Sequence, residues 1–194
     1  MLTDTTVNAM LDNQFVTGAS NMQLSCHSAY SATGANLLGS KAVANFSAAA
    51  SRQKALSAAV DIAITAGNTV KWIGVWDAAG TTFKGMFPNG GSDRTFQIDL
   101  TNDRIYCEQN TLVNDDKITF HGNTPPTGLA TGTTYFIVGN TPGDPDYFQV
   151  AATLGGAAIN LTGQHAAGCV VSKIVEETYG ADGTQRISTL IINL

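Results

Sequence analysis

From Met22 onward the chain consists of short apolar runs separated by breaks rich in glycine and proline. Within residues 60–64 the apolar side chains occupy alternate positions, which is the period of a strand with one buried face. Residues 88–91 and 140–145 form clear breaks. Regularly spaced short strands of this kind are typical of a β-sandwich or a small barrel. We therefore expect a mainly β fold.

A single segment near the N-terminus has the period of a helix. Asp4 or Thr5 is expected to cap this helix, and Gly18 to end it. The apolar positions at helical spacing are Val7, Met10, Leu11 and Phe15.

The last run of the chain, residues 187–194, is too apolar for a free tail, because an unpaired hydrophobic strand is an aggregation risk. This last run should pair either with the strands of the first half of the chain or with another subunit. If it pairs with the first half, the middle of the chain is an insert within one host domain. We expect residues 1–105 with 176–194 to form a host β-sandwich that carries the short helix, and residues 106–175 to form a small inserted β-barrel-like domain. Its strands are expected at residues 117–120, 134–138, 147–150, 158–161 and 169–175.

Charge is scarce in this chain: Asp, Glu, Lys and Arg make up 13%, against about 25% in typical globular proteins. The net charge is −5, and the ten Lys and Arg residues are scattered, which argues against nucleic acid as a partner. No apolar stretch approaches the roughly 20 residues of a membrane span, and the N-terminus lacks signal-peptide features. We expect a chain folded in a cytosol, with no membrane partner and a polar, weakly charged surface suited to packing against neighbours.

The sequence offers no clear catalytic, metal or cofactor site. Three widely spaced cysteines, Cys26, Cys107 and Cys169, do not suggest a disulfide framework. The three histidines occupy separate segments, so no zinc site is expected. Cys26 and His27 are neighbours on an expected strand, so their side chains should point to opposite faces and not form a dyad. We interpret the acidic residues at 115–116 and 144–146 as turn formers rather than calcium ligands.

Two tryptophans, Trp72 and Trp76, lie four residues apart with Gly74 between them. On a strand all three share one face. One interpretation is an aromatic contact surface for a sugar or a protein. The other is core packing between two layers.

Several segments resemble proteins of tailed-bacteriophage virions, of the kind described as tail fibre or minor tail proteins. Residues 24–29 (LSCHSA), 33–36 (TGAN) and 72–78 (WIGVWDA) carry the resemblance in the first half. The middle of the chain is similar to a module of phage tail and decoration proteins. Its matching segments are 116–120 (DKITF), 132–138 (GTTYFIV), 148–151 (FQVA) and 155–162 (GGAAINLT). Ser28, where the family often has threonine, and residues 109–112 depart from the pattern.

The resemblance implies a non-enzymatic structural component of a virion, assembled in the host cytoplasm, whose partners are copies of itself and other virion proteins. Tail, collar and capsid positions stay open, and a capsid decoration or cement protein is the alternative. A carbohydrate-binding module for a host-surface glycan is an alternative of another class. A polysaccharide-cleaving enzyme ranks last, because no pair of carboxylates stands out.

Overall fold

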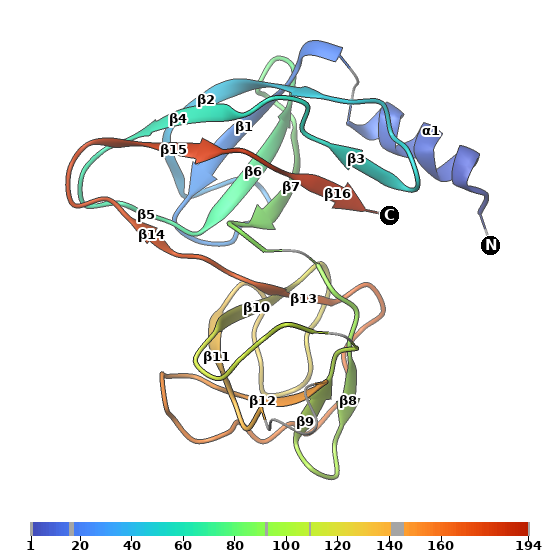
Figure 1. The fold of residues 1–194 in the computed structure, drawn as a ribbon, viewed down its shortest axis with the longest axis vertical. Helices are drawn as coiled ribbons and strands as arrows, with labels where there is room; N and C mark the ends of the chain where they lie inside the picture. Colours follow the sequence, from blue (N-terminus) through green and yellow to red (C-terminus); the bar gives the residue numbers. More distant parts are fainter. Residues whose placement is uncertain (1, 16–17, 92, 109, 141–145, 194) are drawn as a thin grey trace. The chain divides into compact units, whose positions relative to one another are not determined.

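The computed structural model describes residues 2–15, 18–91, 93–108, 110–140 and 146–193. It is mainly β, with antiparallel sheets and one short N-terminal helix, as the sequence predicts (Figure 1). The chain divides into two compact units. Unit 1 comprises Met1–Phe87 and Glu176–Leu194, and unit 2 comprises Pro88–Val175.

Unit 1 contains a four-stranded antiparallel sheet and three two-stranded ribbons. The sheet has the order β2-β1-β6-β7, and the ribbons pair β4 with β15, β3 with β16 and β5 with β14. The C-terminal apolar segment thus pairs with early strands, with Ile187 opposite Val60 and Ile191 opposite Ala55. The strands are β1 (Gly18–His27), β2 (Leu37–Phe46), β3 (Gln53–Ala55), β4 (Val60–Ile64), β5 (Thr69–Val70), β6 (Trp72–Asp77), β7 (Phe83–Pro88), β14 (Glu177–Thr178), β15 (Gly183–Ile187) and β16 (Ile191–Asn193).

The core of unit 1 lies between the inner face of this sheet and the ribbons. Alternate residues of β1 and β6 point into it, which is why Leu24, Cys26 and Val75 are fully buried. Ile62 and Ile64 of β4 belong to the same core. Period-two patterning therefore determines which side chains are buried in this unit.

The helix α1 (Asp4–Gln14) packs on β3 (Figure 1). Thr3, rather than Asp4 or Thr5, is its N-cap, because the Thr3 hydroxyl accepts the backbone N–H of Thr6 at 3.3 Å. Phe15 is its C-cap, three residues before the expected end at Gly18. The buried residues of this segment are Val7, Leu11 and Phe15, whereas Met10 is half exposed.

A polar contact anchors α1 to the loop before β3. The Asp12 carboxylate accepts the backbone N–H of Ala49 at 2.9 Å and the ammonium of Lys54 at 2.5 Å. Lys54 is fully buried, so its charge depends on this carboxylate for compensation.

Unit 2 is one six-stranded antiparallel sheet of order β13-β10-β11-β12-β9-β8, and its described end strands do not pair to close a barrel. Phe120, Ile137 and Phe148 form its fully buried core with Ile105 and Val171. The segment expected as a strand at residues 158–161 is instead irregular, with one bridge between Ala151 and Ala158. The strands are β8 (Gln97–Asp99), β9 (Arg104–Tyr106), β10 (Lys117–His121), β11 (Thr134–Val138), β12 (Tyr147–Ala151) and β13 (Val170–Lys173).

The inserted unit begins at Pro88, whereas the sequence placed its start at residue 106. The reason is strand pairing: β8 pairs with β9, and β9 pairs with β12. Phe96 and Ile105 accordingly belong to the core of unit 2. The composition shift near Tyr106 lies within this unit and does not mark its edge.

Candidate functional site

The segments that carry the resemblance in the first half of the chain meet on the outer face of the sheet in unit 1. Ser25 and His27 are two residues apart on β1, so they share a face, opposite to that of the buried Leu24 and Cys26. On the neighbouring strand β6, Gly74 lies across from Ser25, and Trp72 across from His27. These residues form what we call the motif cluster: Ser25, His27, Ala35, Trp72, Gly74 and Trp76.

A chain of hydrogen bonds, each with a defined donor and acceptor, links the residues of the motif cluster. Because a carbonyl only accepts, Nδ1 of His27 must donate to the Ala35 oxygen, at 2.7 Å. If the imidazole is neutral, Nε2 then accepts from the Ser25 hydroxyl, also at 2.7 Å. The same Ser25 oxygen accepts the indole N–H of Trp76 at 2.7 Å.

Burial sets the charge state of this cluster. Ser25 and His27 are fully buried. Burial lowers the pKa of His27, the hydrogen bond to Ala35 raises it in part, and the nearby ammonium of Lys41 lowers it further. The net shift is downward, so the neutral imidazole is favoured and the tautomer is fixed by Ala35.

Two glycines make the close packing feasible. A Cβ on Gly74 would lie 2.5 Å from Nε2 of His27 and 2.6 Å from the Ser25 hydroxyl. Gly34 has φ +76, and its Cβ would lie 2.5 Å from the Trp76 ring. The loop between β1 and β2 therefore rests directly on the indole.

Both tryptophans are inside the protein rather than on a contact surface. Trp72 is 1% exposed and packs edge-on against Tyr30, and Trp76 is 8% exposed and packs edge-on against Phe83. The Lys41 ammonium lies 3.4 Å from the centroid of the Trp76 ring. Of the two interpretations of Trp72 and Trp76, burial favours packing over an aromatic contact surface.

The Ser25–His27 pair has the hydrogen bond of a nucleophile and its base, but its surroundings leave no place for a substrate. Ser25 is fully buried, and the N–H of Trp76 occupies its oxygen. This pair is not among the residues predicted from the sequence, where Cys26 is the candidate nucleophile, although the two-residue spacing on a strand is a usable signal. Cys26 itself faces the core, and burial raises the pKa of its thiol to about 12.

A second polar cluster lies in unit 2. The Ser172 hydroxyl donates to Asp93 Oδ1 at 2.7 Å, and Nε2 of His121 lies 3.1 Å from that oxygen and 3.0 Å from the Ser172 hydroxyl. Burial alone would raise the pKa of Asp93, but the hydrogen bond and charge of His121, with the Ser172 hydrogen bond, lower it overall. The serine proton points to the carboxylate, so this cluster ties residue 93 to β10 and β13 rather than activating a nucleophile.

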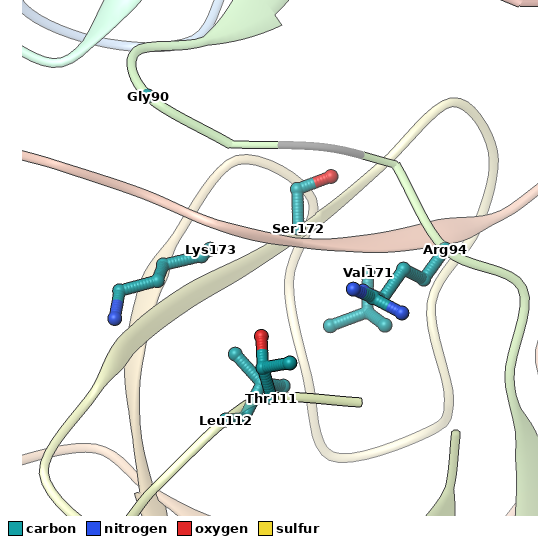
Figure 2. A pocket seen from close by; sticks show the side chains of 7 residues that line it. All are labelled: Gly90, Arg94, Thr111, Leu112, Val171, Ser172 and Lys173. Carbon is teal, nitrogen blue, oxygen red and sulfur yellow. The ribbon is translucent and has the colours of Figure 1, made fainter. Parts of the chain in front are cut away.

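Ser172 also lines a small cavity of about 140 Å³ in unit 2 (Figure 2). Three segments far apart in sequence contribute to it: Gly90 and Arg94 before β8, residues 111–112, and β13. Its lining residues are Gly90, Arg94, Thr111, Leu112, Val171, Ser172 and Lys173.

The remaining candidate ligands do not converge. His165 packs on the Phe96 ring with centroids 4.2 Å apart, and Cys107 and Cys169 are buried in unit 2. Asp116 Oδ2 accepts the backbone N–H of Val113 at 3.1 Å, which is turn chemistry, and residues 144–145 lie outside the described part. Within the described ranges, no three His, Cys, Asp or Glu residues gather as metal ligands would.

Comparisons of the chain with protein-family models, with curated proteins and with solved structures find no match. In the part of the chain that the structure describes, no helix has both the length and the apolar character needed to cross a bilayer.

Proposed function

We propose that this chain is a non-enzymatic structural component of a tailed-phage virion, in a tail fibre, minor tail or collar, and that it acts by packing against copies of itself and other virion proteins. The resemblance suggests this class, and the mainly β architecture is compatible with it. A capsid decoration protein is the alternative within the same class.

The observation that carries the proposal is the outer face of the sheet in unit 1. Leu37 and Val43 of β2 lie opposite His27 and Gln23 of β1, so they share the face of the motif cluster. There they are 42% and 57% exposed. Large apolar side chains on a sheet face with few charges are suited to a protein interface, since little charge has to be desolvated.

Further exposed apolar side chains lie elsewhere on unit 1. They are Leu2, Met10 of α1 and Ile191 of β16.

The glycan-binding alternative depended on exposed indoles, and no observation favours it now that both are buried.

The test places a charge on the proposed interface and measures incorporation into particles. In phage carrying Val43→Asp, we expect the amount of this chain per purified particle to fall at least tenfold. Val113→Asp is the matched control, because Val113 is equally exposed but lies in unit 2. Absence of the wild-type chain from purified particles would refute the proposal, and equal incorporation of both variants would refute the interface.

The position within the particle is a separate measurement. A reconstruction of the particle with the chain traced distinguishes a tail or collar location from decoration of the capsid. Density for this chain on the capsid lattice would favour the decoration alternative.

A further inference from the structure

Lys41 of β2 occupies a position over the motif cluster that depends on charge. Its ammonium lies 3.4 Å from the centroid of the Trp76 ring and donates to the Gly80 carbonyl in the turn between β6 and β7. The same strand carries Leu37 and Val43, the exposed side chains of the proposed interface. Lys41 therefore covers part of the indole on the face that this interface uses.

The titratable side chain inside the motif cluster is His27, and the charged group that acts on it is Lys41. From β6, His27 is faced by Trp72 and Gly74, which do not titrate. The loop between β1 and β2 contributes Tyr30, which packs against Trp72. A protonated imidazole at this site and the Lys41 ammonium repel each other, so each disfavours the other in its present position.

The folded cluster has an acceptor for every donor after it takes up a proton. Nδ1 of His27 donates to the Ala35 oxygen in both charge states. A protonated Nε2 donates to the Ser25 oxygen, while the Ser25 hydroxyl turns to the Gly74 carbonyl, 3.4 Å away. The Ser25 oxygen still accepts the Trp76 N–H with its other lone pair. The hydrogen bonds therefore persist, and what the proton changes is the field that acts on Lys41.

We propose that His27 and Lys41 form a pH-sensitive switch, in which protonation of His27 displaces the Lys41 ammonium from the Trp76 ring and uncovers that part of the outer sheet face. Lys41 is half-buried, and its long side chain lets the ammonium move into water. Burial, with a further contribution from Lys41, holds the pKa of His27 below its ordinary 6.5, so the switch operates below pH 6.5. As a regulation of the proposed interface, it rests on the proposed function.

The test is an NMR titration of the full chain from pH 8 to pH 5 that follows the His27 ring protons and the ε-methylene protons of Lys41. The ring current of Trp76 shifts these methylene resonances upfield, and we expect most of this displacement to be lost with the midpoint of His27. Because coupling between two sites is reciprocal, the His27 midpoint should rise in Lys41→Met. Lys84→Met, which removes a lysine of β7 that does not act on His27, should leave the midpoint unchanged.

His27→Gln assigns the effect to the imidazole, since its Lys41 resonances should stay upfield throughout the titration. Lys41 resonances that stay upfield while His27 titrates would overturn the switch, as would an unchanged His27 midpoint in Lys41→Met. Loss of the dispersed amide spectrum together with the Lys41 displacement would also overturn it, because unit 1 would then unfold instead of releasing one side chain. All of these measurements use the purified chain, so a failed switch is distinguishable from a failed incorporation into particles.

Discussion

Acidification from pH 8 to pH 5.5 is expected to destabilise unit 1 through His27. Burial lowers the pKa of the folded His27 below the ordinary 6.5, so below pH 6.5 the unfolded chain binds a proton that the folded chain excludes. The stability due to His27 is complete above pH 6.5 and is lost as the pH falls toward the folded pKa. Linkage sets an upper limit of about 1.4 kcal/mol on this loss at pH 5.5, which is reached when the folded imidazole remains fully neutral.

Tryptophan fluorescence during urea unfolding measures this loss selectively, because Trp72 and Trp76 are the chain's two tryptophans and both lie in unit 1. His27→Gln is the comparison. We expect it to be less stable than wild type by about 1–3 kcal/mol at pH 8, because buried hydrogen-bond partners are left unsatisfied. Its stability should be nearly flat between pH 7 and pH 5.5. The same pH dependence in wild type and His27→Gln would refute the reasoning, since other groups would then cause the loss.

Three more substitutions and one control have defined expectations, each measured as a change in the free energy of urea unfolding. Gly74→Ala should lower the free energy of unfolding by about 2–4 kcal/mol, because its methyl group would overlap the buried His27 imidazole and Ser25 hydroxyl. An unchanged urea midpoint of unfolding would contradict the close packing at Gly74. Thr119→Val should be neutral or stabilise by about 1 kcal/mol, because the fully buried Thr119 hydroxyl has no hydrogen-bond partner among the described residues. A clear loss of stability would reveal a partner such as an ordered water. Asp12→Asn should lower the free energy of unfolding by about 1–3 kcal/mol, because the buried Lys54 ammonium loses the carboxylate of Asp12. The control Arg186→Gln, at an exposed ion pair, should lower it by less than about 0.5 kcal/mol.

Local patterning was sufficient for the fold class but not for the division into units. The alternating residues of β4 and the paired C-terminal strand follow from period-two burial and from the cost of an unpaired apolar strand. The boundary at Pro88 depends on β9 pairing with β12, some 40 residues away, and no local signal encodes such a partner. Composition changed where the turns became denser, near Tyr106, rather than where the unit begins.

The candidate sites show the same limit. That Ser25 and His27 share a face follows from the sequence, yet the partner of His27 is a carbonyl in a loop that returns eight residues later. Likewise, Arg94 and Lys173 are about 80 residues apart, and only the pairing of Arg94 with Val171 brings them to one cavity. Sites that depend on non-local pairing cannot be read from spacing alone.

The motif cluster gives a physical reason for the residue types that carry the family resemblance. Glycine is needed at 74 because the imidazole and hydroxyl fill the space of its side chain, and at 34 because φ is positive beside an indole. Histidine is needed at 27 because one ring must donate a hydrogen bond to the Ala35 carbonyl and accept one from the Ser25 hydroxyl. A buried polar network of this kind fixes one loop conformation, since every alternative leaves a polar group unsatisfied. The loop in turn covers part of the sheet face on which Leu37 and Val43 remain exposed, so the cluster determines how much of that face is available to the proposed interface.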